Sequence, residues 1–491
     1  MLIKVFQPPS LEMSKRKQKA KTQAKVLETI DSEVRLADDF VSKPHDYTTG
    51  PIIKPLVMLS VPIIIINILQ TLFQITDAFW VGRLGAEAVA AISISFPILF
   101  LATSIGFGLT LAGTIIVAQY KGKKDQKGIN HVATQLILLV IAFSFFTGII
   151  GFLLSEPLLT LMGADKSIIG GATAYLQISF LGLGFVFAYI AFQSIMRGVG
   201  SVNMPLLITL GAVILNVFLD PLLIFGFGPV PQMGVAGAAI ATIISQALCA
   251  AIALIILLRG KSGIQIKLIG LIKPDFVLMK KIIFIGVPSS IEFVSRSLSM
   301  LAFTFVVASF GTIAVASFGL GIRIFSFILM PALGLSMATS TLVGQNIGAQ
   351  KMHRVNDTIK KAMIISFASL MLVGALMFVF ADPVTRFFVP NDEALITETA
   401  FFVRLLALSF GIIGVQTVIL GAIRGSGATK IAMNLSIIFT IISLAGAYVL
   451  AYFTPLGLSG IWWSYPITNI LTLIIAYIFL KKSNWAKVRV I

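Results

Sequence analysis

The sequence predicts an all-α membrane protein with twelve transmembrane helices arranged in two pseudo-symmetric six-helix lobes. Three observations lead to this fold class: long apolar runs, basic residues confined to alternate loops, and an internal repeat. Of the 491 residues, 57% are hydrophobic and 12% are charged, whereas a soluble protein carries about 25% charged residues. Because so few charged side chains cannot cover a soluble protein of this length, the composition predicts a chain embedded in a lipid bilayer.

Long apolar runs recur along the chain, separated by short polar breaks. Most of them hold the roughly 20 residues that an α-helix needs to cross about 30 Å of hydrocarbon. A transmembrane β-barrel would instead show alternating hydrophobicity in segments of about ten residues, which these runs lack. The twelve predicted spans lie near 55–80, 88–119, 130–154, 172–196, 204–224, 234–258, 281–308, 313–345, 361–381, 400–423, 431–453 and 457–480.

Lys and Arg residues fall almost entirely on one side of these spans. The C-terminal tail and the loops on its side hold 21 of them, and the opposite loops hold three. Since cytoplasmic loops are the ones rich in Lys and Arg, we expect both termini in the cytoplasm. The net charge of +17 is then mainly a topology signal, and nucleic-acid binding is not expected. The basic loops are 120–129, 197–203, 259–281, 346–361 and 424–430.

The first 50 residues differ in composition from the rest of the chain. The basic run from Lys15 to Lys25 is followed by neither an apolar segment nor a cleavage site, so it is not a signal peptide. We expect residues 1–50 to form a disordered cytoplasmic tail that can contact anionic lipid. An N-terminal six-helix lobe is then predicted over 51–270 and a C-terminal six-helix lobe over 271–491.

The two predicted lobes repeat each other at an offset of 226 residues. Over positions 85–130, 12 of 46 residues are identical to those 226 positions later. The matches include polar residues, among them Gln119 with Gln345, which shared apolar composition does not explain. Each repeat contains six spans, so both have the same orientation in the membrane. Such parallel repeats are typical of transporters with a site between or within the lobes.

Six charged residues fall inside predicted spans. A charge at the centre of a transmembrane helix costs about 2.5–3.5 kcal/mol on insertion scales, so each one is a functional candidate. Glu292 and Arg296 lie four residues apart on one helix face and are expected either to pair structurally or to contact substrate. Arg404 begins a span and is expected to extend to the outer surface. The six are Asp77, Asp220, Glu292, Arg296, Arg323 and Arg404.

Asp77 and Asp220 are the predicted proton- or cation-binding residues. Both lie near the outer ends of spans in the first lobe, and Asn216 shares a helix face with Asp220. Carboxylates shielded from water can take a proton near neutral pH. Together with an amide oxygen they also suit a hard cation such as Na⁺. The alternative interpretation is that Asp220 only begins a turn with Pro221.

Other polar residues mark a predicted substrate pathway. Asn67, Gln70, Gln74 and Asp77 follow one another at helical spacing and form a polar stripe along the first span. Pro62 removes a backbone hydrogen bond in the same span and is expected to let the helix bend. The substrate-pathway candidates are Asn67, Gln70, Gln74, Gln193, Glu292 and Arg296.

Features of an enzyme or of a metalloprotein are not recognisable. The one cysteine, Cys249, excludes a disulfide framework and a cysteine-rich metal site. The histidines His45, His131 and His353 lie in the tail or at basic loops, too scattered to share a metal ion. No catalytic dyad falls within one span. We therefore expect neither enzymatic activity nor a cofactor.

The sequence resembles the multidrug and toxic compound extrusion (MATE) transporters over roughly residues 45–480. The resemblance depends on the order and spacing of several segments together with the repeat of six plus six spans. These segments are "TTGPIIKPLVMLSVP", "ITDAFWVGRLGAEAVAA", "VAQYKG", "RGVGSVNMP", "LNVFLDPLLIFG", "VGQNIGA" and "IRGSGATK".

The resemblance implies an antiporter that exports organic, often cationic or amphipathic, compounds in exchange for H⁺ or Na⁺. Members with a cation site in the first lobe carry an Asp on the first helix and Asn-x-x-x-Asp on the fifth, where Asp77, Asn216 and Asp220 stand. Arg296 and Ile413 occupy the places of the second-lobe carboxylates of other members. The chain therefore resembles the DNA-damage-inducible and archaeal-type branch.

We expect a multidrug efflux antiporter that works as a monomer in the prokaryotic inner (plasma) membrane. Its coupling ion is H⁺ or Na⁺, and Na⁺ would bind at Asp77, Asn216 and Asp220. The alternative within transport is a flippase for lipids or lipid-linked sugars from the same wider superfamily, which Arg296 and Arg323 favour. Twelve spans and the carboxylates of the first lobe favour the antiporter.

Overall fold

A computed structural model describes residues 46–260, 263–266, 273–483, 485–487 and 490, and residues 1–45 of the predicted tail lie outside it. The described first half contains α2 (Ile53–Gly82), α3 (Ala86–Gly122), α4 (Gln126–Leu161), α5 (Lys166–Val199), α6 (Asn203–Phe225) and α7 (Gly234–Arg259). The described second half contains α9 (Phe276–Ala308), α10 (Thr312–Gly348), α11 (Met352–Val379), α12 (Ala381–Phe388), α13 (Glu393–Ala407), α14 (Phe410–Gly425), α15 (Thr429–Tyr452), α16 (Leu458–Lys482) and the 3-10 turn η1 (Trp485–Lys487).

The all-helical membrane fold that the sequence predicts is confirmed. Within the described residues, eleven helices are long and apolar enough to cross a bilayer, and α13 with α14 forms a twelfth, bent span. The prediction was wrong in detail for this tenth span, which was expected as one helix over 400–423. It consists of two helices that meet at 52°, and the short helix α12 precedes them.

The bend follows from local chemistry at the break between α13 and α14. Ser409 donates its hydroxyl to the carbonyl of Leu406 at 2.7 Å, and such a bond competes with the helical hydrogen-bond ladder. Gly374 of α11 lies against this turn, where an added Cβ would come within 2.6 Å of the carbonyl oxygen of Ala407. Because Gly374 has no side chain, α11 packs closely against the backbone at the break between α13 and α14.

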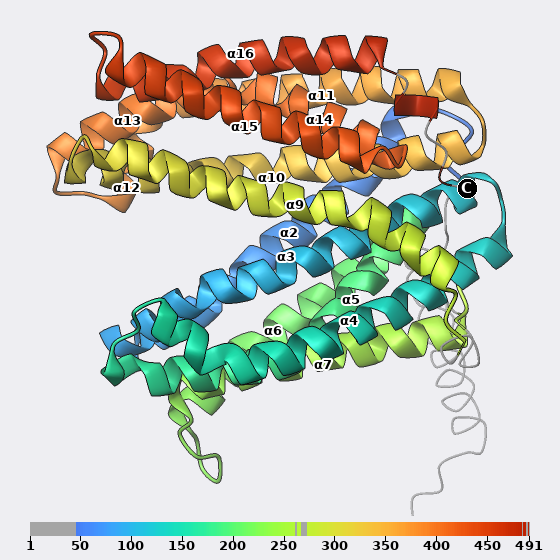
Figure 1. Cartoon of the computed structure of the whole chain (residues 1–491), viewed down its shortest axis with the longest axis horizontal. Helices are drawn as coiled ribbons and strands as arrows, with labels where there is room; N and C mark the ends of the chain where they lie inside the picture. Colours follow the sequence, from blue (N-terminus) through green and yellow to red (C-terminus); the bar gives the residue numbers. More distant parts are fainter. Residues whose placement is uncertain (1–45, 261–262, 267–272, 484, 488–489, 491) are drawn as a thin grey trace, which may run out of the picture.

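The two halves of the chain occupy opposite sides of the molecule, as Figure 1 shows. Helices α2 to α7 lie together on one side and α9 to α16 on the other. They meet through α2 against α10, α3 against α9, and α3 against α10. The first two pairs correspond to each other under the 226-residue repeat, because α3 matches α10 and α2 matches α9.

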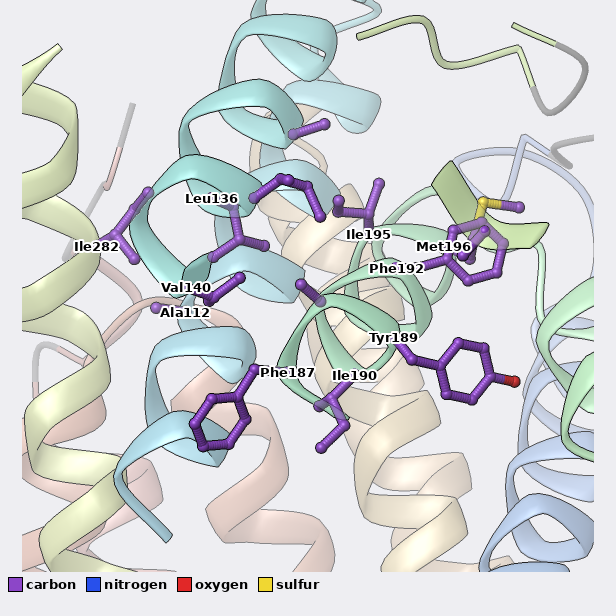
Figure 2. Packing of buried hydrophobic residues seen from close by; sticks show 14 of the residues in the cluster. Ala112, Leu136, Val140, Phe187, Tyr189, Ile190, Phe192, Ile195, Met196 and Ile282 are labelled. Atoms are coloured by element: carbon purple, nitrogen blue, oxygen red, sulfur yellow. The ribbon is translucent and has the colours of Figure 1, made fainter. Parts of the chain in front are cut away.

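Each half contains a densely packed apolar interior. In the first half, aliphatic and aromatic residues of α3, α4 and α5 pack together, and Ile282 of α9 joins them (Figure 2). In the second half the interior is aromatic, with Phe402 and Trp462 at 4.2 Å between ring centroids and Phe318 stacked on both. These interiors hold the helices that carry the polar residues described below.

Two glycines bring the halves into direct backbone contact. We call the end of the molecule with the basic loops, which is predicted to be cytoplasmic, the inner end. There an added Cβ on Gly122 of α3 would lie 1.8 Å from the carbonyl oxygen of Gln345. An added Cβ on Gly348 of α10 would lie 1.9 Å from that of Gln119. Since only glycine has no Cβ, it permits this crossing of α3 and α10.

Two glutamine side chains complete this contact, which we call the inner seam (Gln119, Gly122, Gln345 and Gly348). Gln119 Nε2 donates to the carbonyl oxygens of Ser426 at 3.0 Å and Gly425 at 3.4 Å. Gln345 Nε2 donates to that of Gly198 at 2.9 Å. The repeat relates Gln119 to Gln345 at an offset of 226 and, after a shift of one residue, Gly198 to Gly425, so the seam is pseudo-symmetric.

We expect Gly122→Ala to lower stability by about 1–3 kcal/mol, because the added methyl group meets backbone atoms that cannot move aside. Thermal unfolding of the purified protein in detergent would measure the loss. Gly211→Ala is the matched control, since that helical glycine has no atom within 4 Å of an added Cβ. Equal unfolding temperatures for the two variants would contradict the close backbone contact at Gly122 in the inner seam.

Residues 46–50, which were assigned to the disordered tail, are held at the inner end before α2. Tyr47 is buried and donates its hydroxyl to the carbonyl of Gly200 at 3.0 Å. From the second half, Arg354 Nη1 donates to the carbonyl of Gly50 at 2.9 Å and Lys351 Nζ to that of Thr48 at 2.9 Å. Residues 46–50 are therefore held in the fold, because their backbone carbonyls accept bonds from residues about 300 positions away.

Asp275 caps the start of α9 and connects it to α4. Its carboxylate accepts a hydrogen bond from the backbone N–H of Leu278 at 3.0 Å and lies 2.8 Å from His131 Nε2. The backbone hydrogen bond, followed by the bond to His131, holds the pKa of Asp275 below its usual value of 3.8. The ionised carboxylate therefore stabilises the folded state.

Asp275→Ala should cost about 1 kcal/mol of stability at neutral pH, as other N-cap deletions do. Because the pKa of Asp275 is lower in the folded state than when unfolded, this stabilisation is present above pH 3.8 and is lost as the pH falls through the folded value. The stability gap between wild type and variant should therefore close in acid. Asp275→Asn retains a cap and should lose less; an identical loss for both variants would exclude the capping role.

Candidate functional site

The carboxylates predicted to bind a proton or cation lie together in the first half. Asp77 stands near the end of α2, and Asp220 and Asn216 stand one turn apart on α6. Asn216 and Asp220 are fully buried, and Asp77 is half-buried. Because α6 continues past Pro221 to Phe225, Asp220 does not begin a turn. Its alternative interpretation as a turn residue is therefore wrong.

Hydrogen bonds orient both carboxylates. Asn216 Nδ2 donates to Asp220 Oδ1 at 2.9 Å, and the hydroxyl of Thr242 in α7 donates to Asp77 Oδ2 at 3.2 Å. Asp220 and Asn216 are also among the groups that interact with the Asp77 carboxylate. Tyr175 of α5 is close enough to both aspartates to interact electrostatically with their carboxylates. Four helices of the first half therefore surround one acidic site.

Three oxygens of this site are buried without a hydrogen-bond donor among the described residues. They are Asp77 Oδ1, Asn216 Oδ1 and Asp220 Oδ2. A buried acceptor without a partner is costly, and two adjacent carboxylates that are both ionised repel each other. A shared proton would relieve both costs. A hard cation would do so too, because it binds carboxylate and amide oxygens.

The polar stripe along α2 does not form a second buried site. Asn67 and Gln70 are half-buried and Gln74 is exposed. Pro62 lies inside α2, which continues from Ile53 to Gly82 without interruption. The stripe ends at Asp77 of the acidic site. Among the described contacts, the side chains of Asn67, Gln70 and Gln74 share no hydrogen bond with that site.

Gln193 belongs to a separate hydrogen-bonded group between α5 and α6. It is buried, and its Nε2 donates to the Thr209 hydroxyl at 3.4 Å. Tyr189 lies 2.7 Å from the same hydroxyl and donates to the carbonyl of Pro205 at 2.9 Å. These contacts join the two helices; they place Gln193 in the interior of the first half, apart from the hydrogen bonds of the acidic site.

Glu292 and Arg296 pair as predicted, but a third residue completes their cluster. The side chain of Glu292 is 3% exposed, and its Oε1 lies 3.2 Å from Arg296 Nη2 and 3.3 Å from Arg424 Nη1. Arg424 also donates to the hydroxyl of Ser336 at 3.2 Å. Arg424 was expected in the basic loop 424–430, although α14 extends to Gly425. We call these three residues the Glu292 cluster.

The remaining two charges inside predicted spans differ from each other. Arg404 is partly exposed, pairs with Asp382 of α12 and donates to the carbonyl of Phe378. Arg323 is exposed on α10. Among the described residues, no group of three His, Cys, Asp or Glu side chains could hold a metal ion.

The MatE family model matches residues 62–222 and again residues 288–449, one match in each half and 226 residues apart at their starts. The chain belongs to the MatE family. The probable multidrug resistance protein YpnP of Bacillus subtilis is 32% identical to this MatE protein over 456 residues, covering 90% of this chain and 98% of YpnP. The FAD transporter of Shewanella oneidensis is 25% identical over 442 residues, covering 88% and 95%.

A crystal structure of a MATE protein in the bent conformation superimposes on this MatE chain with a TM-score of 0.84 at 25% identity, covering 90% of this chain and 97% of the other. The resemblance to MATE multidrug transporters is thereby confirmed. The protein is a multi-pass membrane transporter of this family and not an enzyme. The branch within the family stays a prediction.

Glu292→Gln should destabilise the protein by about 3–5 kcal/mol, since it leaves the largely buried Arg424 without its carboxylate. The exposed pair Arg386–Glu393, at 2.5 Å, is the matched control, because such surface pairs contribute about 0–1 kcal/mol. Thermal unfolding of Glu292→Gln and Glu393→Gln in detergent would compare them. A Glu292 variant as stable as the Glu393 variant would contradict the buried cluster.

Proposed function

We propose that this MatE protein is a secondary active antiporter that exports organic, cationic or amphipathic compounds in exchange for H⁺ or Na⁺. The observation that carries the proposal is the pair of buried carboxylates, Asp77 and Asp220, with three unpartnered oxygens at one point. When the pair gains one proton or one Na⁺, its charge changes from −2 to −1, and the repulsion between the two carboxylates is relieved. Asn216 supplies the third oxygen, and no further cofactor is needed.

Coupling between ion and cargo follows from linkage. Protonation or Na⁺ binding changes the charge of the first half, so the free energy of any cationic compound held beside it changes as well. The two ligands need only compete or interact energetically. Pro62 lies in the same helix as Asp77, and we propose that it lets α2 bend when the charge of Asp77 changes.

The remaining parts of the proposal concern location and assembly. The 21 basic residues on one side support cytoplasmic termini in a prokaryotic inner membrane. Each chain contains both halves and the whole acidic site, so we propose that a monomer suffices. The two six-helix lobes over 51–270 and 271–491 would rock against each other around the inner seam.

A flippase for anionic lipids is the second candidate function. The Glu292 cluster favours it, because two arginines around one carboxylate leave a positive charge that an anionic headgroup could balance. The Asp77–Asp220 pair favours the antiporter instead. Export of dyes against transfer of labelled lipids, measured in the same proteoliposomes, would distinguish the two functions.

In proteoliposomes, Asp77→Asn should reduce uphill dye export to the level of empty vesicles, because an amide neither gains nor loses a proton. Asp220→Asn should do the same. Glu87→Gln removes an exposed carboxylate at the start of α3 and is the matched control, with export expected to match wild type. Export by Asp77→Asn at the wild-type rate would contradict the proposal, provided its unfolding temperature is unchanged.

Separately imposed pH and Na⁺ gradients would identify the coupling ion in the wild-type protein. We expect one of the two gradients to drive accumulation of dye against its own gradient, and the Asp220→Asn variant to lose that response. If neither gradient drives uphill movement, antiport is wrong for this chain.

A further inference from the structure

The Glu292 cluster carries one more positive charge than it can neutralise internally. Glu292 contacts Arg296 and Arg424 through the same carboxylate, and Glu292 and Arg296 are the charged groups that act on Arg424. A single carboxylate balances one guanidinium. The second positive charge is left inside a membrane-spanning region, where an unbalanced charge is costly.

Arg296 is the member of the cluster that remains accessible. Its side chain is 37% exposed, compared with 13% for Arg424 and 3% for Glu292. Within the described contacts it uses only Nη2, in the bond to Glu292. A guanidinium has five N–H donors, so most of the donors of Arg296 are open to a ligand while Glu292 holds the side chain in place.

The position of the cluster links it to the boundary between the halves. On α9, Ser290 donates its hydroxyl to the carbonyl of Ile105 in α3 at 3.0 Å, and Phe293 lies 6.1 Å from Phe107 between ring centroids. Arg296 follows on the next turn. Arg424 directly precedes Gly425 and Ser426, which accept the hydrogen bonds of Gln119 in the inner seam.

The repeat makes the cluster one-sided. At the 226-residue offset, Glu292 corresponds to Ile66 and Arg296 to Gln70, so the first half has no charge at these positions. Conversely, Asp77 corresponds to Phe303. One half thus presents paired carboxylates and the other presents a basic cluster. Of these two charged sites, the Glu292 cluster in the second half is the one whose charge is complementary to a negative group of the cargo.

We propose that Arg296 binds an anionic group of transported amphipathic compounds, namely a carboxylate, sulfonate or phosphate. Glu292, which also pairs with Arg424, holds the Arg296 side chain in place. A guanidinium matches the geometry of such oxyanions and can bind them through two parallel hydrogen bonds. The bound anion supplies the negative charge that the cluster lacks. Transport of such compounds rests on the proposed function, whereas their binding needs no gradient.

Equilibrium binding to the full-length protein in nanodiscs tests the assignment, with fluorescence polarisation of two matched dyes as the readout. One dye is a rhodamine with a free carboxylate and the other is its methyl ester, which lacks the negative charge. Arg296→Gln should weaken binding of the acid at least about tenfold, the usual effect of losing a charged hydrogen bond, and leave the ester close to wild type. Arg296→Lys keeps the charge and should retain part of the affinity for the acid.

Arg386→Gln is the control for loss of a distant positive charge, and it should leave both dyes unaffected. Nanodiscs with and without anionic phospholipid separate the two sources of the anion. If anionic lipid competes with the acid dye in wild type but not in Arg296→Gln, a lipid phosphate occupies the site. If anionic lipid does not compete with the dye in wild type, the site belongs to soluble amphipaths.

Equal weakening of both dyes by Arg296→Gln, or no weakening of either, would overturn the inference. These outcomes are independent of coupling. If Arg296→Gln leaves the preference between acid and ester unchanged while the pH or Na⁺ gradient still drives export of the ester, only the anion site is refuted. If binding depends on Arg296 but neither gradient drives export, only the antiporter is refuted.

Discussion

A charge or an unpaired polar group inside the hydrocarbon layer has to be compensated, and every part of the candidate site depends on this requirement. Glu292 meets it with two arginines. The side-chain amide nitrogens of the two inner-seam glutamines meet it with backbone carbonyls of the opposite half. Asp77 and Asp220 meet it only in part, through Asn216 and Thr242. We propose that this incomplete compensation makes the acidic pair responsive to a proton or a cation.

The internal repeat is retained where the halves touch and broken where they carry charge. At the inner seam, Gly122 and Gly348 occupy corresponding positions, and each permits the other helix to approach. A pseudo-symmetric contact of this kind suits two halves that move as units, because neither has to deform. The carboxylates are not duplicated: the acidic pair belongs to the first half and Glu292 to the second, although Arg424 of the Glu292 cluster corresponds to Arg197. One scaffold thereby holds two chemically different surfaces.

Much of the acidic site could be predicted from single positions, because charged residues in apolar runs are rare. The spacing of Asn216 and Asp220 predicts their shared helix face, and the structure brings both next to Asp77. Thr242 and Tyr175 were missed, since a hydroxyl in a span carries no distinguishing signal. Arg424 was missed for a different reason: it lies in the last turn of α14, where helix and basic loop look alike in sequence.

The sequence by itself determined the membrane class, the twelve spans and the repeat. These depend on composition and on local or periodic patterns, which do not require knowledge of distant contacts. Only the tertiary structure decided that α13 and α14 meet at a bend, that residues 46–50 lie against Arg354, and that Arg424 completes the Glu292 cluster. The last two features join groups far apart in the chain, and residues 46–50 are held through their backbone carbonyls. Since every residue has the same carbonyl, the sequence does not reveal which one a distant side chain will find.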